Sequence, residues 1–171
     1  MIVFCDTETT GIGPTARVIQ IAMDLCTDDG RTVATLNTII NQETPCHSRA
    51  LEVHGITDAM QATGLDRYVA GNLISKIAAE AHVIIGHNIP FDIDMCKQSF
   101  MSVHLPFASY CTMRTLTPVC KIPSPKGGLK WPKLSEAYRH FFNEDFDNAH
   151  NAWADVQACK RLYFKCKELG L

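Results

Sequence analysis

Two carboxylates stand two residues apart at the end of a short apolar segment. Residues 2–6 predict a strand, and the breaker-rich residues 9–14 predict a turn directly after Asp6 and Glu8. Because residues i and i+2 of a strand project from one face, both carboxylates are expected to point into one site. Like charges this close are costly unless a cation lies between them, and carboxylate oxygens suit Mg²⁺ or Mn²⁺. Alone, the pair is also typical of a solvated strand end.

A third carboxylate, Asp92, follows a predicted buried strand over residues 83–85. A glycine ends that strand, and Pro90 stands where an early helical residue is expected. Asp92 is therefore expected in the first turn of a helix over residues 91–100, where the helix dipole alone would favour an acid. Asp94 would point about 200° away around that helix, which predicts a surface position.

His150 and Asp155 form the last pair. A five-residue offset is about 140° on a helix, so the two side chains share a site only if His150 lies on the loop before the helix that carries Asp155. A histidine on such a loop can move and can accept a proton near neutral pH. The alternative is an exposed loop histidine without a chemical role.

Taken together, four carboxylates and one histidine predict a two-metal phosphoryl-transfer site. With these residues in place, the sequence resembles the DEDDh (DnaQ-like) 3′→5′ exonucleases, which have the ribonuclease-H-like fold. The resemblance runs in order through most of the chain. It rests on four motifs: Asp6-Thr7-Glu8-Thr9-Thr10-Gly11, Val53-His54-Gly55-Ile56-Thr57, His87-Asn88-Ile89-Pro90-Phe91-Asp92 and His150-x-Ala152-x-x-Asp155.

The resemblance implies a role for each matched position. The ligands of two divalent ions, Mg²⁺ or Mn²⁺, would be Asp6, Glu8, Asp92 and Asp155. His150 would deprotonate the attacking water, and the product would be a nucleoside 5′-monophosphate. The implied contacts to the terminal nucleotide are Thr9, Thr10, Gly11, Val53, His54, Asn88 and Phe91, although Phe91 also fits a core position.

The resemblance favours single-stranded or frayed DNA 3′ ends as the substrate. The Asp-Thr-Glu-Thr-Thr-Gly form is closer to the proofreading and DNA-trimming branch of the family than to the oligoribonuclease branch. An RNA-trimming 3′→5′ exoribonuclease of the same fold stays open, and so does a catalytically idle relative that only binds nucleic acid. The sequence does not decide whether a polymerase or a second copy of the chain is a partner.

The elements that position these residues are predicted to be strands in the first part of the chain and mainly helices after them. Three strands in an antiparallel meander are predicted over residues 2–6, 17–26 and 32–40, the second with one buried face. Helices are predicted over 65–82, 91–100, 134–142 and 155–169, around the buried strand at 83–85. This order predicts an α/β fold, a ribonuclease-H-like mixed sheet of the antiparallel meander plus parallel strands, covered by helices.

Length and charge exclude several classes of protein. A chain of 171 residues that is 46% apolar suits a single exonuclease domain over residues 1–171 and excludes disorder of the whole chain. No apolar run is long enough to cross a membrane, and the first residues do not resemble a secretory signal, so a cytoplasmic location is expected. The net charge of -2 argues against a broad basic surface, but it is the sum of -6 over residues 1–110 and +4 over residues 111–171.

Two further features concern cysteine and lysine. The eight cysteines include no C-x-x-C spacing, which predicts reduced structural thiols, with redox or metal roles as the alternative. Cys159 and Cys166 are seven residues apart and are expected to face the core. The segment Lys121–Lys133 combines prolines, glycines, four lysines and Trp131, which predicts an exposed loop that either follows a nucleic-acid strand or is merely solvated.

Overall fold

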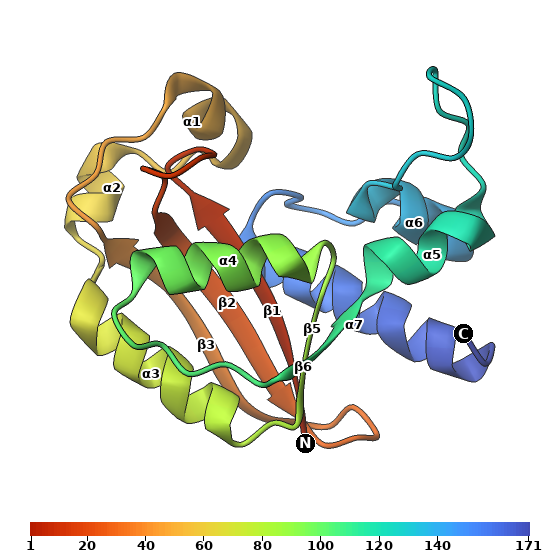
Figure 1. The fold of residues 1–171 in the computed structure, drawn as a ribbon, viewed down its shortest axis with the longest axis horizontal. Helices are drawn as coiled ribbons and strands as arrows, with labels where there is room; N and C mark the ends of the chain where they lie inside the picture. The colour runs from red at the N-terminus through yellow and green to blue at the C-terminus, as the bar shows by residue number, and fades with distance from the viewer.

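The computed structural model describes all residues, 1–171, and its centre is a mixed sheet of six strands. The strand order is β4-β3-β2-β1-β5-β6, in which β1, β2 and β3 are antiparallel and β5 and β6 run parallel to β1 (Figure 1). The strands are β1 (Ile2–Thr9), β2 (Val18–Cys26), β3 (Thr32–Asn41), β4 (Leu65–Asp66), β5 (Val83–Gly86) and β6 (Ala108–Cys111). The predicted meander with added parallel strands is therefore confirmed.

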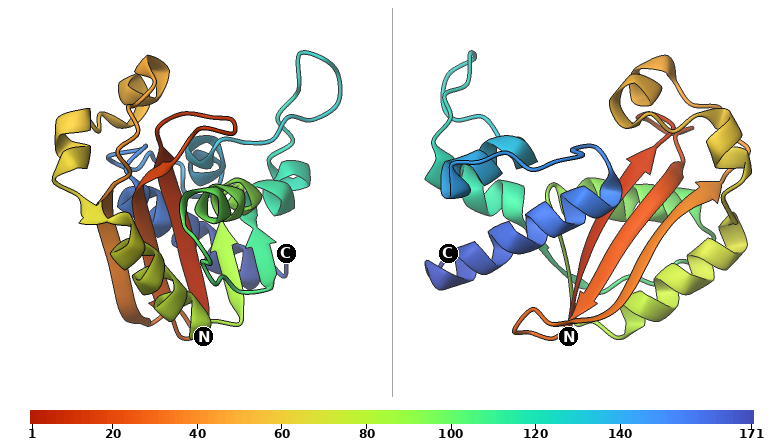
Figure 2. Two further views of the ribbon diagram at one scale, coloured as in Figure 1. Left: turned by 60° about the vertical axis from the view of Figure 1, so that its left-hand side comes forward. Right: turned by 180° about the vertical axis from the view of Figure 1, so that it is seen from behind.

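Seven helices surround the sheet. They are α1 (Ser48–His54), α2 (Asp58–Ala62), α3 (Arg67–Ala79), α4 (Ile89–Ser99), α5 (Thr112–Cys120), α6 (Leu134–Phe142) and α7 (Ala152–Glu168). Helices α3 and α4 cover one face, and α7 crosses the other, as the view from behind shows (Figure 2). Helices α1 and α2 lie at the end of the sheet where β1 and β3 finish (Figure 1).

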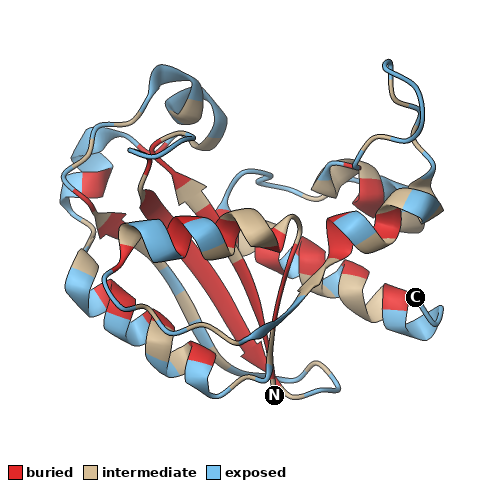
Figure 3. Ribbon diagram, in the orientation of Figure 1, coloured by how far each residue is buried: buried red, intermediate tan, exposed pale blue.

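The core has a layer on each side of the sheet, and β1 divides its side chains between them. Val3 and Cys5 pack with α3 and α4, whereas Ile2 and Phe4 pack with α7. The buried colour accordingly runs along the central strands and the inward sides of the helices (Figure 3). A third cluster joins α5 and α6 to the C-terminal half of α7. By alternation, Asp6 and Glu8 project on the α7 side.

The structure corrects four of the expected elements. The second strand is buried on both faces, not one, because helices cover both sides of the sheet at its centre. The first expected strand continues through Thr9, so both acids lie within it. The helix expected over residues 65–82 begins only at Arg67, after the short β4. Helix α7 begins at Ala152, ahead of the expected position, because Asn151 caps its first turn.

Five elements were not predicted from the sequence: α1, α2, β4, β6 and α5. Both α1 and α2 are short, with seven and five residues, and α5 contains Pro118. Strand β6 has only four residues. Elements this short carry too few residues for a clear hydrophobic period.

All eight cysteines are free thiols, and both Cys159 and Cys166 are buried as expected. None of the helices is long and apolar enough to span a bilayer.

Candidate functional site

Three acidic side chains meet where β1 ends and α7 begins. Asp6 and Glu8 come from β1, and Asp155 comes from the first turn of α7. One ligand atom from each lies within 4.8 Å of the others, so the three could share a metal ion. The i, i+2 pattern on the strand, and a helix that starts just before Asp155, are the local features that bring them together. The geometry expected for these three residues is present.

The cluster lacks a positive partner. None of the three carboxylates takes part in a salt bridge, and the buried Oδ1 of Asp155 has no hydrogen-bond partner. Burial, followed by repulsion from Asp155 and Asp92, raises the pKa of Glu8 to about 8. Burial together with three neighbouring carboxylates raises the pKa of Asp6 well above its ordinary value. A site this unfavourable for anions fits a divalent cation, which would restore the charge balance.

Asp92 lies beside this group and is held differently. It is buried in the first turn of α4, and its Oδ1 accepts hydrogen bonds from the Thr7 hydroxyl at 2.7 Å and the Thr7 backbone N–H at 3.0 Å. Burial raises the pKa of Asp92 to about 7, although these hydrogen bonds act in the opposite direction. The three-residue ligand group does not include Asp92, but its charge is the largest carboxylate influence on Asp6. Both hydrogen bonds from Thr7 reach the same carboxylate oxygen of Asp92.

His150 lies on the loop before α7, as expected. Its backbone has a positive φ of 69°, and its N–H donates to Oδ2 of Asp155 at 3.2 Å. Burial raises the pKa of Asp155 to about 6, and the hydrogen bond and charge of His150 oppose that rise. The imidazole itself is exposed and makes no hydrogen bond. His150 is thus tied to the cluster by its backbone while its ring stays free.

A cavity of about 710 Å³ opens next to Glu8, between the end of β1 and α1. Its walls include most of the predicted nucleotide contacts: Thr9, Thr10, Gly11, Val53 and His54. His54 Nδ1 accepts the N–H of Ile56 at 3.0 Å, so its other nitrogen, Nε2, carries the proton and donates to the Thr9 carbonyl at 3.2 Å. His54 therefore fixes the strand end that forms one side of the cavity.

The remaining predicted contacts, Asn88 and Phe91, do not line this cavity. Asn88 precedes α4 with a φ of 74° and makes no side-chain capping bond, while Phe91 is partly buried against the core. Gly86 allows the end of β5 to pass close to β1, because a Cβ there would lie 2.8 Å from the Cys5 carbonyl oxygen. Helix α4 then begins beside β1 and carries Asp92.

Three residues that shape the site were not predicted from the sequence. Gln20 of β2 pairs with Glu8 in register, and its Oε1 accepts the Ala152 N–H at the start of α7 at 3.4 Å. His47 and Arg49 line the cavity, and the His47 N–H donates to the Thr10 carbonyl at 2.8 Å. Strand pairing of β1 with β2 was predicted, so its register would have indicated Gln20. No local pattern marks His47, because histidine is an uncommon N-cap residue.

The mixed sheet, with acids at the carboxyl end of a central strand and a helix facing them, defines a protein of the ribonuclease-H-like fold. The chain belongs to the exonuclease family RNase_T, whose profile matches residues 3–163. Among solved structures, Escherichia coli exonuclease I in complex with a dT13 oligonucleotide has a TM-score of 0.77 and 17% identity; the match covers 97% of this chain and 40% of that one.

Two curated relatives differ in how much of their length matches. A DNA polymerase III subunit epsilon-like protein of Rhodobacter capsulatus is 39% identical over 97 residues, which are 54% of this chain and 14% of that protein. An uncharacterized exonuclease of Escherichia phage 186 is 27% identical over 164 residues, or 91% of this chain and 82% of the relative. The chain thus corresponds to a small part of the first relative and to most of the second.

Proposed function

We propose that the chain is a single-domain, metal-dependent 3′→5′ exonuclease that releases nucleoside 5′-monophosphates from single-stranded or frayed DNA ends. The observation that carries the proposal is the group of Asp6, Glu8 and Asp155, whose ligand atoms lie within 4.8 Å of one another without a cationic partner. Membership of the exonuclease family supports phosphodiester cleavage. The likeness to an exonuclease bound to dT13 supports single-stranded DNA as the substrate.

Asp6, Glu8 and Asp155 would hold Mg²⁺ or Mn²⁺, with Asp92 completing the site from the α4 side. When bound, the two ions supply positive charge for the scissile phosphate and make the attacking water more acidic. Asp92 has one oxygen engaged by Thr7, which leaves its other oxygen free to face the ions. These residues bind and orient; none of them needs to act as a nucleophile.

His150 would act as the general base. Its ring is exposed and unbonded, while its backbone N–H holds it to Asp155, so an imidazole nitrogen can approach the attacking water and accept its proton. The cavity beside Glu8 would receive the terminal nucleotide, with Thr9 to Gly11 and Val53 among the residues that line it. His54 would keep that strand end in place through its bond to Thr9.

A strand-degradation assay tests the proposal directly. A 5′-labelled single-stranded DNA should shorten as a ladder from its 3′ end with Mg²⁺ or Mn²⁺, and EDTA should stop the reaction. Internal cuts, or cutting that persists in EDTA, would contradict the mechanism. Parallel digestion of a duplex with a mispaired 3′ end and of an RNA strand measures substrate choice, because faster shortening of the RNA would reassign the substrate.

The role of His150 has its own test. His150→Ala should lower the rate by about 100-fold or more, within the range typical of a lost general base, while the metal dependence of thermal stability stays close to that of the parent. His104, another exposed histidine, provides the control: His104→Ala should retain full activity. A loss of metal binding in His150→Ala would make the histidine a ligand.

A further inference from the structure

The hairpin loop, Lys121–Lys133 between α5 and α6, carries positive charge that the protein itself does not balance. The segment contains four lysines and no acidic residue. Lys130 pairs with Glu136 at 2.5 Å, but the exposed side chains of Lys121, Lys126 and Lys133 make no ion pair. A surface with three unpaired positive charges and no nearby loop carboxylate fits a polyanion.

The hairpin loop has a defined shape. Pro123 and Leu129 form an isolated antiparallel bridge, and the Lys130 N–H donates to the Ile122 carbonyl at 2.9 Å. Its tip turns through Gly127 and Gly128, which have φ angles of 91° and 73° that other residues rarely adopt. A loop with these internal bonds can hold its lysines in position instead of collapsing on the surface.

The hairpin loop rises at the same end of the molecule as the catalytic acids. In Figure 2 (left), the end of β1 lies between α1 on one side and the hairpin loop on the other. The cavity proposed for the terminal nucleotide is on the α1 side. A strand whose 3′ end occupies that cavity can therefore continue across the cluster toward the hairpin loop.

The base of the hairpin loop is fixed to the turn that carries the catalytic motif. His87 Nε2 donates to the Pro132 carbonyl at 2.9 Å, and its Nδ1 lies 3.0 Å from the Thr112 hydroxyl. His87 directly follows β5 and stands five residues before Asp92. The position of the hairpin loop is thus set by the same turn that places a catalytic acid.

Trp131 lies next to this anchor and is 63% exposed. No aromatic ring of the protein stacks on it. Unpaired bases of single-stranded DNA stack on such rings, a contact worth about 1–3 kcal/mol per base. We infer that the hairpin loop binds the single-stranded DNA that lies 5′ of the nucleotide being removed, through lysine–phosphate contacts and stacking on Trp131. This inference rests on the proposed exonuclease function.

Binding can be measured apart from cleavage, so the inference about the hairpin loop and the proposed exonuclease function can be refuted independently. Fluorescence anisotropy in EDTA compares a labelled oligothymidine of about 20 nucleotides with a dinucleotide. Lys121→Ala/Lys126→Ala should weaken binding of the long strand by about tenfold at low salt, and its log–log salt slope should become shallower by about 1.4 for two lost phosphate contacts. Trp131→Ala should also weaken binding of the long strand, with little change in the salt slope.

The matched control is Lys76→Ala/Lys97→Ala, which removes the same charge from exposed positions on α3 and α4 and should leave binding close to that of the parent. Hydrolysis of a chromogenic thymidine monophosphate ester, which is too short to reach the hairpin loop, should be equal in all variants. Equal affinity of the parent and Lys121→Ala/Lys126→Ala for the long strand would overturn the inference. So would an equal loss in the control pair. A parent that binds through the hairpin loop yet degrades no strand would leave the inference standing and refute the proposed exonuclease function.

Discussion

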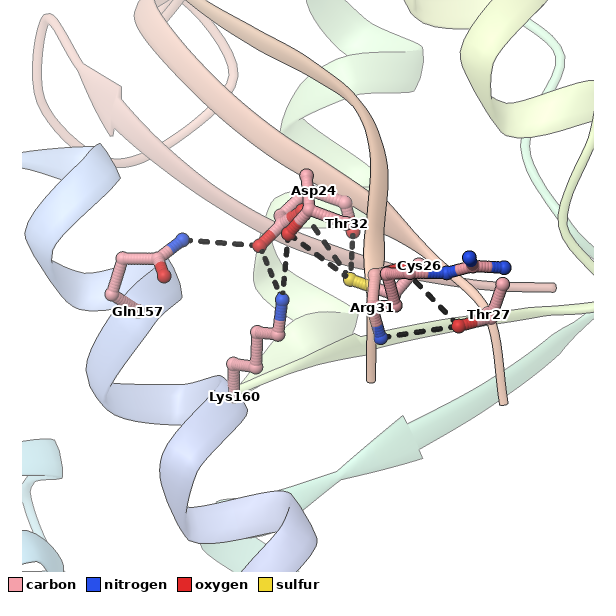
Figure 4. Close-up of polar contacts among 7 residues, drawn as sticks. All are labelled: Asp24, Cys26, Thr27, Arg31, Thr32, Gln157 and Lys160. Carbon is pink, nitrogen blue, oxygen red and sulfur yellow. Dashed lines mark hydrogen bonds and ion pairs between the residues drawn. The ribbon is translucent and has the colours of Figure 1, made fainter. Parts of the chain in front are cut away.

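Two carboxylate sites lie on the same face of the sheet, both against α7, and they differ in how their charge is balanced. At the first, Asp24 of β2 is fully buried and accepts hydrogen bonds from Lys160 Nζ at 2.9 Å and Gln157 Nε2 at 3.1 Å (Figure 4). At the second, Asp6 and Glu8 of β1 face Asp155, and no cationic side chain pairs with them. One helix therefore contributes a cation to one site and a further anion to the other.

The pKa values follow this difference. Burial alone would raise the pKa of Asp24, but the hydrogen bonds from Lys160 and Gln157 bring it below its ordinary value. Burial and like charges instead raise the pKa of Glu8 to about 8. A carboxylate with a built-in cation contributes to stability, whereas carboxylates without one are costly and need an added ion. Asp24 and Lys160 thus form a structural pair, whereas the acidic cluster is the proposed metal site.

The largest expected effect comes from removing an acid at the unbalanced site, the cluster of Asp6, Glu8 and Asp155. Asp155→Asn should lower exonuclease activity by about 1,000-fold or more, because the proposed metal site loses a ligand. The same change should raise the melting temperature of the metal-free protein, since repulsion with Glu8 and Asp6 is relieved, and should weaken the further rise on adding Mg²⁺.

Strand degradation and thermal melts with and without Mg²⁺ measure both effects. Asp94→Asn, at an exposed position of α4, serves as the control and should change neither. A metal-free Asp155→Asn protein that melts below the parent would mean that Asp155 stabilises the fold. The proposed difference between the two carboxylate sites would then be wrong.

At the balanced site, formed by Asp24 and Lys160, removal of the cation should lower stability and leave activity unchanged. Lys160→Met leaves Asp24 buried without its charge partner and should lower the free energy of unfolding by about 3 kcal/mol. Activity per folded molecule should stay near that of the parent, because Lys160 is not part of the acidic cluster. Urea unfolding and strand degradation below the transition provide the two readouts.

Lys165→Met is the matched control for this change. Lys165 is on the same helix but pairs with Glu168 at the surface, so its loss should cost less than about 1 kcal/mol. If both substitutions destabilise equally, the Asp24 pair is not the reason for the effect. Restoration of part of the lost stability in Asp24→Asn/Lys160→Met would confirm that the unpaired charge is the cause.

Asp92 is intermediate between the two sites, because its partners are the neutral hydrogen-bond donors of Thr7. Thr7→Val removes the hydroxyl bond and should lower the turnover number by about tenfold, in line with one lost hydrogen bond to a charged group. Thr7→Ser keeps a hydroxyl and should restore most of the rate. If Thr7→Ser loses activity while Thr7→Val retains it, the methyl packing of Thr7, rather than its bond to Asp92, would be the important feature.

The sequence predicted the unbalanced site far better than the balanced one. The acids of the cluster lie near element ends: Asp6 and Glu8 at the end of a strand, and Asp155 at the start of a helix. Spacings of this kind are visible in the sequence as short motifs. The Asp24–Lys160 pair joins residues 136 positions apart, and it depends on how α7 crosses β2. Neither residue has a local signal, so only the tertiary packing reveals the pair.

The elements of the fold differ in the same way between local and tertiary signals. An alternating apolar pattern predicted β2, β-branched residues predicted β3, and helical spacing predicted α3, whereas α1, α2 and α5 are held by tertiary contacts and end caps. For α1, the His47 N–H bonds to Thr10, a contact between segments that are far apart in the chain. The cavity beside Glu8 is built by α1, which is why the family resemblance implied Val53 and His54 but nothing in the local sequence placed them.

The smallest expected effect concerns acid pH at the balanced site. Since the pKa of Asp24 is lowered in the folded protein, its ion pair contributes fully above the unfolded value of about 3.9, and the contribution is lost as the pH falls through the folded pKa. The free energy of unfolding of the parent should therefore fall more steeply than that of Asp24→Asn/Lys160→Met between about pH 5 and about pH 3.

Urea unfolding in EDTA across this range measures the difference between the two proteins. The acidic cluster is the same in both, so its own protonation cancels in the comparison. A difference that stays constant with pH would show that Lys160 does not hold the charge of Asp24, and the contrast between the two carboxylate sites would then depend on burial alone.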